Sequence, residues 1–530
     1  MNRLLLALSS GILAASALLA APAPTALKLP AFLSAHMVLQ RDMPVPIWGL
    51  AATGQEVTVE FAGQKITARA DDQGRWRVTL DPLPASAESR TLTVTSVTAK
   101  GEKDKLELDD VLVGDVWVGA GQSNMAQTGM GYTNDPVLVA NAKEAYPLLR
   151  LATANKSWNL SSSNANPRFS ALLFSFGVPL QKEIKVPVGL IVGAVGGTPS
   201  GYWLSKEAYE SDAGCKADVE KAAAAFVPSQ YEAQCATLMQ AWTKNVAVAT
   251  KAGAPAPAQP KMPLKPGEVQ AGRLGYLYTA HIKPLLPFAI KGVLWDQGES
   301  GTAIGGVNQD TLMNALIRGW RKEWGQGEFP FLFVQKPSGG GCAWDPKDPV
   351  TSHAEPFTAL SAAPAFSGTY RETHLRIRLI PGTFMVTSSD LGSGTHPANK
   401  SGYGARAARV ALGAVYGRPL EIYGPMLATN VVEGGKIRLT FDHVGQGLAF
   451  PTNAPANGAG PAVLQGFAVA GTNKVFHWAT AVIEGNTLVV SSDKVPQPVA
   501  VRYAWSQQHP WANLFNRDGL PAQAFRTDTW

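Results

Sequence analysis

Five short, almost wholly apolar runs, separated by helical stretches, constrain the fold of this 530-residue chain most strongly. Continuous apolar runs of this length are typical of parallel strands buried on both faces, and strands that alternate with helices form α/β domains. Candidate helices include residues 311–324 and 402–416. The five runs are residues 111–118, 188–193, 290–295, 331–334 and 383–387. The sequence therefore predicts an α/β domain with a parallel sheet over residues 111–417.

The segments on either side of this domain have sequence patterns typical of antiparallel β-strands. Residues 27–110 contain short runs rich in β-branched residues, separated by turn signals such as Asp71-Asp72-Gln73-Gly74. The β texture returns over residues 418–530. We predict an N-terminal β-sandwich and a C-terminal β-rich domain of sandwich or jelly-roll type. Between them, residues 250–268 form a Pro-, Ala- and Lys-rich stretch that is expected to lie on the surface.

The N-terminus has the features of a targeting signal over residues 1–26. Arg3 supplies a positive charge, residues 4–19 are largely apolar, and small residues follow at Ala20, Ala21 and Ala23. A membrane anchor is the alternative, but the apolar stretch is short for a bilayer span. We expect signal removal, no membrane association afterwards, and a periplasmic or secreted protein.

Charge and cysteine content exclude several classes of partner. The formal charge is +6, yet no run of basic residues builds the positive stripe that a nucleic-acid surface needs. Of the three cysteines, Cys215 and Cys235 could pair, which leaves Cys342 over. The histidines are dispersed, and no Cys/His cluster has zinc-ligand spacing. We expect neither nucleic-acid binding nor a metal or other cofactor.

The first candidate for chemistry is Ser123, in the turn Gly119-Ala120-Gly121-Gln122-Ser123-Asn124-Met125 after the first buried strand. Glycines allow a sharp turn there, and open α/β sheets place their ligand sites at this end of their strands. Met125 takes the place of the second glycine of a G-x-S-x-G elbow, so the α/β-hydrolase motif is excluded. Taken alone, a serine such as Ser123 would more often be an ordinary turn serine than a nucleophile.

The second candidate is the loop of residues 388–397, which contains Asp390 and His396 and also follows a buried strand. A serine hydroxyl is a weak nucleophile that needs an imidazole to take its proton and a carboxylate to orient that imidazole. Asp390 and His396 lie in one loop and could reach one site. A capping aspartate and an ordinary loop histidine remain the alternative.

Two further loops could supply an oxyanion hole. Gly196 and Gly197 follow the second buried run, where their backbone N–H groups could approach a substrate. Gln297, after the third run, offers an amide donor. Each such donor stabilises a developing oxyanion by about 3 to 4 kcal/mol. Two tight turns without a catalytic part are the alternative.

Together these motifs resemble the sialate O-acetylesterase-like branch of the SGNH hydrolases, which overlaps carbohydrate esterase family 20. The motifs are Gly121-Gln122-Ser123-Asn124-Met125, Gly196-Gly197-Thr198, Trp295-Asp296-Gln297-Gly298-Glu299-Ser300 and His396-Pro397-Ala398-Asn399-Lys400. Flanking motifs near both ends of the mature chain, Met37-Val38-Leu39-Gln40-Arg41 and Asn513-Leu514-Phe515-Asn516, extend the resemblance. It implies a flavodoxin-like SGNH domain with Ser123 as nucleophile and His396 as base. It also implies an oxyanion hole of the Ser123 backbone, Gly196, Gly197 and Gln297.

The chain departs from the family pattern at two places. Many SGNH hydrolases have their acid three residues before the histidine, where this chain has Ser393; Asp390 is therefore assigned the orienting role. A usual glutamine of the family's Arg-Glu-x-Gln stretch is replaced by His374. Residues near the site that could contact a sugar are Asn124, Trp203, Trp295 and Glu299.

The sequence thus predicts a monomeric carbohydrate O-acetylesterase with a Ser-His-Asp acyl-enzyme mechanism. Its substrate is expected to be an acetylated oligosaccharide or polysaccharide, either hemicellulose of the xyloglucan or xylan type or 9-O-acetylated sialate. A glycoside hydrolase that uses paired carboxylates among Asp296, Glu299 and Asp390 is one alternative. A carbohydrate-binding protein without catalytic activity is the other.

Overall fold

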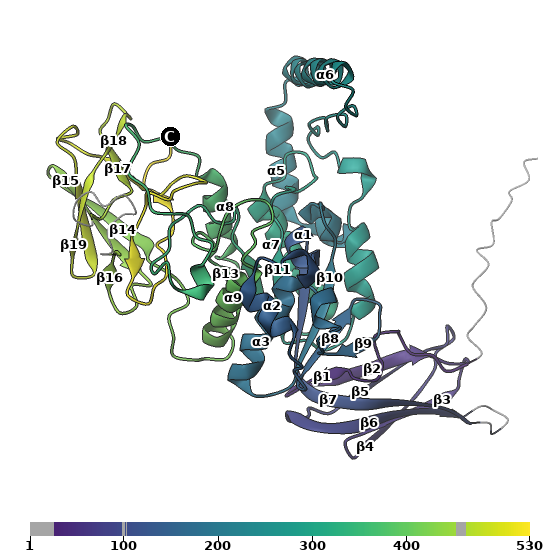
Figure 1. The fold of residues 1–530 in the computed structure, drawn as a ribbon. Helices are drawn as coiled ribbons and strands as arrows, with labels where there is room; N and C mark the ends of the chain where they lie inside the picture. Colours follow the sequence, from purple (N-terminus) through teal and green to yellow (C-terminus); the bar gives the residue numbers. More distant parts are fainter. Residues whose placement is uncertain (1–25, 98–100, 102, 452–462) are drawn as a thin grey trace, which may run out of the picture.

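A computed structural model describes residues 26–97, 101, 103–451 and 463–530 of the chain. It contains a central α/β region, a strand-rich N-terminal region and a strand-rich C-terminal region on the opposite side (Figure 1). The predicted signal segment lies outside the described residues except for its last position. Within the described part, none of the helices combines the length and the apolar character that a bilayer span requires.

The central sheet contains all five predicted buried strands. Its order is β13-β12-β11-β7-β10-β8-β9, and every neighbouring pair is parallel except β8 and β9. If β8 and β9 are left out, the other five strands can be numbered along the chain from β7 as strand 1. Their order across the sheet is then 2-1-3-4-5, as in flavodoxin-like folds. Ligands of such sheets bind at the carboxyl ends of the strands where the order reverses, which here is beside β7. The strands are β7 (Lys103–Gly121), β8 (Leu149–Thr153), β9 (Trp158–Leu160), β10 (Val188–Ala194), β11 (Gly292–Asp296), β12 (Phe331–Val334) and β13 (Thr383–Val386).

Strand β7 is shared between the central sheet and the N-terminal region. Its first half pairs with β6 and β1, and its second half pairs with β10 and β11. The domain boundary predicted between residues 110 and 111 therefore falls inside one continuous strand. Strands β3, β4 and β6 form an antiparallel set beside it, and β2 pairs with β5. The remaining bounds are β1 (Val38–Gln40), β2 (Val45–Leu50), β3 (Glu56–Phe61), β4 (Gln64–Arg69), β5 (Arg75–Leu80) and β6 (Ser86–Val97).

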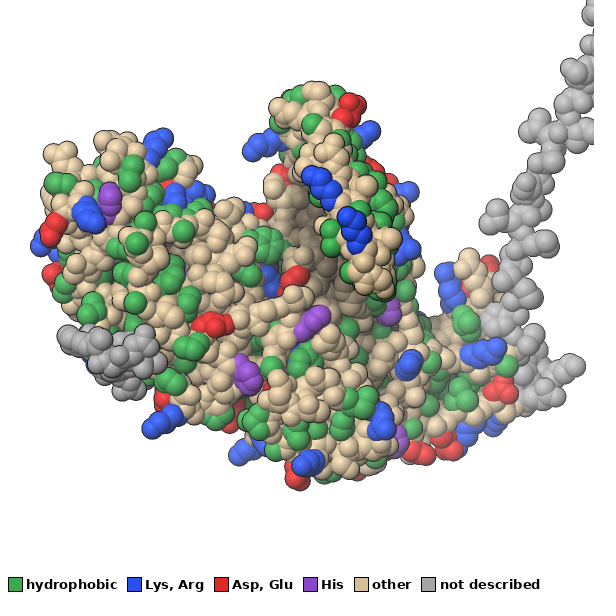
Figure 2. Space-filling model, turned by 45° about the horizontal axis from the view of Figure 1, so that its top comes forward, with side chains coloured by type: hydrophobic (Ala, Val, Ile, Leu, Met, Phe, Trp, Pro, Cys, Tyr) green, Lys and Arg blue, Asp and Glu red, His purple; other side chains and the backbone are tan. Residues whose placement is uncertain are grey.

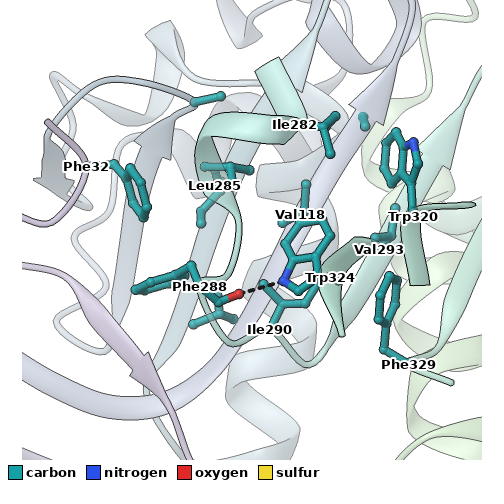
Figure 3. Packing of buried hydrophobic residues seen from close by; sticks show 14 of the residues in the cluster. Phe32, Val118, Ile282, Leu285, Phe288, Ile290, Val293, Trp320, Trp324 and Phe329 are labelled. Carbon is teal, nitrogen blue, oxygen red and sulfur yellow. Dashed lines mark hydrogen bonds between the residues drawn. The ribbon is translucent and has the colours of Figure 1, made fainter. Parts of the chain in front are cut away.

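The two faces of the central sheet are buried by different helices, because successive side chains of a strand point to opposite faces. Val116 and Val118 of β7 belong to the cluster that contains α7, whereas Trp117 belongs to the cluster that contains α3 and α9. Figure 3 shows the first cluster, where Trp324 of α7 donates a 2.7 Å hydrogen bond to the Phe288 carbonyl. The helices are α3 (Ala171–Ile184), α7 (Gln309–Trp324), α8 (Thr369–Ile377) and α9 (Lys400–Ala414), with short α1 (Ser123–Ala126) and α2 (Pro136–Ala142).

A helical arm projects from the central region (Figure 1). It consists of α4 (Lys206–Ser211), α5 (Ala213–Ala224) and α6 (Pro228–Lys251), and none of the residues of α6 is fully buried. The predicted surface stretch over residues 250–268 follows α6 and is largely exposed. Cys215, Cys235 and Cys342 are all free, so the pairing considered for the first two is not formed.

The C-terminal region has a core of its own. Two four-stranded antiparallel sheets, with the orders β14-β15-β20-β19 and β18-β17-β21-β23, enclose apolar side chains that include Leu439, Phe467 and Val501. Strands β16 and β22 form a separate pair. The bounds are β14 (Met426–Glu433), β15 (Lys436–Asp442), β16 (Leu448–Ala449), β17 (Phe467–Ala470), β18 (Phe476–Trp478), β19 (Thr480–Glu484), β20 (Thr487–Ser491), β21 (Ala500–Tyr503), β22 (Phe515–Asn516) and β23 (Phe525–Arg526).

The turn after β7 requires glycine at position 121. Gly121 has φ of +124°, and an added Cβ would lie 2.2 Å from the Asp296 carbonyl oxygen. We expect Gly121→Ala to lower the free energy of unfolding by about 2 to 5 kcal/mol, from backbone strain and the clash together. Urea unfolding of the purified variant measures this loss. Gly434 also has a positive φ but open space around it, so Gly434→Ala is the matched control with the smaller expected loss. Equal losses would contradict the prediction.

Candidate active site

Ser123 lies at the carboxyl end of β7, at the position where the strand order reverses. The turn is fixed to the neighbouring strand by a 2.8 Å hydrogen bond from the Gln122 N–H to the Asp296 carbonyl. Beneath it, Met125 is fully buried. The side chain of Ser123 itself is only half-buried, so the hydroxyl is presented at this edge of the sheet as the sequence predicted.

His396 reaches the same place from the loop between β13 and α9. Its Nε2 lies 2.9 Å from the Ser123 Oγ, although the two residues are 273 positions apart. In the tautomer with an unprotonated Nε2, the serine hydroxyl donates this hydrogen bond. The geometry is that of a hydroxyl nucleophile with an imidazole base. The structure thus brings the two main predicted residues together.

The glycine turn of the predicted oxyanion hole also lies against Ser123. A Cβ added to Gly196 would be 3.6 Å from the Ser123 Cβ, and both Gly196 and Gly197 are exposed. Gln297 is buried, and its Oε1 accepts a 3.2 Å hydrogen bond from Gln309. Its Nε2 donates to the Gly301 carbonyl at 3.2 Å. The Gln297 amide is therefore held in one orientation by its own loop and α7.

The surface above this edge of the sheet is hollowed. Figure 2 shows a depression between the helical arm and the C-terminal β region. Helix α1, which begins at Ser123, lies at this edge of the sheet in Figure 1. His396 is exposed, as are Thr395 and Gly394 beside it. The Ser123–His396 pair is accordingly accessible from solvent.

Asp390 does not contact His396 in the structure. Its carboxylate is fully buried and accepts two hydrogen bonds from Arg406, at 3.1 and 2.8 Å. Ser393, three residues before His396, donates a hydrogen bond to Glu355. The orienting role predicted for Asp390 therefore has no supporting contact, and the carboxylate of Glu355 lies next to the histidine loop instead. The sequence alone could not identify Glu355, because this residue lies outside every motif predicted to form the site.

The two tryptophans predicted to stack on sugar are core residues, so that prediction is wrong. Trp203 and Trp295 are 0% and 1% exposed and contact each other edge to face, with ring centroids 6.0 Å apart. Trp295 also packs against Trp320 of α7. The reason is strand alternation: Trp295 points to the α7 face of the sheet rather than along the strand toward the site.

Asn124 and Glu299 were also predicted to contact substrate, but their polar atoms are bonded to protein. Asn124 is 1% exposed and donates a 3.0 Å hydrogen bond to the Thr395 carbonyl, so the prediction is wrong for this residue. The Glu299 side chain is 24% exposed. Its two oxygens accept hydrogen bonds from Gln122 and from Lys336, at 2.5 and 2.9 Å.

A buried group of charges lies behind the nucleophile turn. Lys336 contacts Asp296 at 2.7 Å and Glu299 at 2.9 Å, and Lys400 contacts the Asn124 amide oxygen at 2.7 Å. Burial acts to raise the pKa of Glu299, but the Lys336 ammonium outweighs burial and lowers it. Burial lowers the pKa of Lys400 to about 7. Lys336 was not predicted from the sequence, although it lies two residues after a predicted buried strand.

Within the described residues, no group of three or more His, Cys, Asp or Glu side chains is placed to hold a metal ion. The groups described at the site are a hydroxyl, an imidazole, amide donors and a set of paired charges.

Comparisons with known proteins agree with this chemistry. Residues 113–264 match the family described as carbohydrate esterase, sialic acid-specific acetylesterase. The sialate O-acetylesterase of Rattus norvegicus is 28% identical over 58% of this chain and 59% of its own length. That of Mus musculus is 25% identical over 78% of each chain. A crystal structure of a carbohydrate acetylesterase from Xanthomonas citri is 29% identical, with a TM-score of 0.69 over 95% of this chain and 100% of that one.

By name these relatives are acetylesterases, and the chain is similar to them in sequence and, for the Xanthomonas citri enzyme, in fold. More narrowly, residues 113–264 match the model of the sialic acid-specific acetylesterases, and this match confirms the family resemblance seen in the motifs.

We expect Asp390→Asn to act on stability rather than on the histidine. Removing one partner of a buried ion pair costs about 3 to 5 kcal/mol, because the other charge is left without compensation. The Arg406 side chain is 4% exposed, so its buried positive charge would be left without a partner. Urea unfolding should therefore show a large loss, while turnover per folded molecule stays within about tenfold of wild type. An unchanged stability with turnover reduced about ten-thousandfold would instead show that Asp390 orients His396.

The stability of the protein should fall as the pH drops from about 6.5 to 4. Burial lowers the pKa of His374 to about 4, whereas its ordinary value is 6.5. Between these values the unfolded chain binds more protons than the folded chain, so the free energy of unfolding decreases as the pH falls. His374→Phe removes this group, and its urea midpoint should decline less steeply than that of wild type between pH 6.5 and 4. Parallel curves for the two proteins would contradict the prediction.

Proposed function

We propose that this protein hydrolyses acetyl esters on carbohydrate through an acetyl-enzyme intermediate, with Ser123 as nucleophile and His396 as general base. The observation that carries the proposal is the 2.9 Å contact between His396 Nε2 and Ser123 Oγ, at the edge of the sheet where ligands of this fold bind. The acetylesterase names of the relatives suggest which acyl group is removed.

The first half of the reaction is attack on the acetyl carbonyl carbon. Ser123 Oγ forms the new bond while His396 takes the hydroxyl proton. The negative charge on the carbonyl oxygen is stabilised by the Ser123 N–H and the turn of Gly196 and Gly197, with the Gln297 amide as a further donor. The carbon–oxygen bond to the sugar then breaks, and His396 returns the proton to the departing sugar oxygen. In the second half, water attacks the acetyl carbon while His396 takes its proton. The bond from that carbon to Ser123 Oγ then breaks, His396 returns the proton to Ser123, and acetate leaves.

The substrate class rests on the relatives and on the openness of the site. Ser123 is half-buried, and His396, Gly196 and Gly197 are exposed, which suits an acetyl group carried on a bulky glycan. We propose acetylated hemicellulose of the xyloglucan or xylan type, or O-acetylated sialate. The predicted signal segment supports a periplasmic or secreted location. The flanking β regions, which we interpret as accessory domains of sandwich or jelly-roll type, support a glycan substrate as well.

No observation favours the glycoside hydrolase. The carboxylates it would use are paired: Asp296 and Glu299 with Lys336, and Asp390 with Arg406. A general acid needs a proton to give, and a nucleophilic carboxylate must face the substrate. Such a reaction also assigns no role to the Ser123–His396 contact.

Ser123→Ala should reduce acetate release by several orders of magnitude, because the residual rate over water comes only from binding and the oxyanion donors. Acetate is measured enzymatically on acetylated xyloglucan, acetylated xylan, O-acetylated sialic acid and an aryl acetate. Ser352→Ala, on an exposed loop, is the control and should match wild type. Retention of most activity by Ser123→Ala would overturn the nucleophile, and release of reducing ends instead of acetate would support a glycosidase.

A further inference from the structure

The sheet itself does not set the distance between Ser123 and His396. Ser123 follows β7 and His396 follows β13, and these strands are separated by β11 and β12 in the sheet order. Ser123 opens helix α1 two residues beyond β7, and His396 lies in the loop beyond β13, so no ladder hydrogen bond joins these two residues. Other contacts must therefore hold the two segments so that Ser123 Oγ and His396 Nε2 lie 2.9 Å apart.

One carboxylate joins the two neighbours of the nucleophile. Glu299 Oε2 accepts a 2.5 Å hydrogen bond from Gln122 Nε2, and Glu299 Oε1 accepts a 3.4 Å hydrogen bond from Asn124 Nδ2. Gln122 and Asn124 directly precede and follow Ser123. The turn that carries the hydroxyl is therefore attached on both sides to a residue of the β11 loop.

Asn124 continues the connection to the histidine loop. The same Nδ2 donates a 3.0 Å hydrogen bond to the carbonyl of Thr395, the residue before His396. The Asn124 Oδ1 accepts a 2.7 Å hydrogen bond from Lys400, in the first turn of α9. The amide of one side chain thus bridges the nucleophile turn and both ends of the segment that carries the imidazole.

Lys336, two residues after β12, holds the Glu299 carboxylate in place. Its ammonium contacts Glu299 at 2.9 Å and Asp296 at 2.7 Å, and its side chain is 1% exposed. In this buried space the Lys336 ammonium pairs with both carboxylates, while Lys400 binds the Asn124 amide oxygen. Hydrogen bonds in such a low-dielectric place are stronger than in water, and the connection is correspondingly stiff. The two strands that separate β7 from β13 thus provide the contacts that span the gap.

We propose that Glu299 and Asn124 are positioning residues that hold Ser123 and His396 in register, an inference that rests on the proposed function. Neither residue touches the reacting atoms. Both act through the loops that carry those atoms. Misplacement of a reacting group by about 1 Å costs on the order of a hundredfold in rate. Loss of either residue is therefore expected to slow the chemistry of Ser123 in a protein that remains folded.

The test measures the reactivity of Ser123 directly. A fluorophosphonate probe reacts with an activated serine: the Oγ–phosphorus bond forms, the phosphorus–fluorine bond breaks, and the serine proton leaves through the base. Mass spectrometry gives the rate of adduct formation at Ser123 without any glycan. We expect Glu299→Gln and Asn124→Ala each to lower this rate by about tenfold to a hundredfold. The double variant should be slower than the worse single variant by no more than about twofold, because the two residues act as one unit.

The control separates positioning from general loss of stability. Asp528 in the C-terminal region is also a buried acid that binds an arginine, Arg502, with two hydrogen bonds of 2.7 and 2.6 Å. Asp528→Asn should lower the thermal midpoint and leave the labelling rate of the folded protein unchanged. Wild-type labelling rates in Glu299→Gln and Asn124→Ala would overturn the inference alone, as would fully multiplicative effects in the double variant. A wild-type protein that is not labelled at Ser123 would overturn the proposed function and the inference with it.

Discussion

Strand β7 is the constraint on which the rest of the structure depends. Its first half is paired into the N-terminal sheet and its second half into the central sheet, so one stretch of backbone belongs to both. Asp115, in the middle of the strand, is fully buried and binds Arg41 and Tyr416 at 2.9 and 3.0 Å. The strand ends at Gly121, two residues before Ser123. The strand that leads to the nucleophile is thereby anchored in two hydrophobic cores.

The buried charges behind the site are better explained by geometry than by stability. Replacing a buried ion pair with apolar groups is often neutral or stabilising, because desolvation offsets the Coulombic attraction. What apolar side chains cannot do is accept directed hydrogen bonds from Gln122 and Asn124 on either side of one serine. Lys336 contributes here as well, because its ammonium lowers the pKa of the Glu299 carboxyl against the effect of burial. The network therefore belongs to the site even though none of its members touches the Ser123–His396 contact.

The sequence predicted the parts of the fold and site that depend on local pattern. Apolar runs identified the five buried strands, and the carboxyl ends of those strands identified the loops of Ser123, Gly196 and His396, which the structure brings together. The errors concern the direction of side chains. Nearness in sequence to a site loop could not reveal that Trp295 points into the α7 core. Nor could it reveal that the partner of Asp390 is Arg406, sixteen residues further on in α9. Lys336 was missed because a lysine after a strand has no motif.

The buried carboxylates lie beside Ser123 and not beside His396, and this affects how the imidazolium would be stabilised. In a buried triad, a carboxylate is needed to stabilise the imidazolium that forms when the serine gives up its proton. His396 is exposed, so water can hydrate the imidazolium and less of that stabilisation has to come from a side chain. The buried carboxylates lie instead on the serine side, where the Lys336 ammonium pairs with both Asp296 and Glu299. The glycine turn of Gly196 and Gly197, with its amide donors, lies at the exposed surface. The site accordingly combines a half-buried serine with an exposed histidine, an arrangement that suits the acetylated glycan proposed as substrate, because the protein need not enclose it.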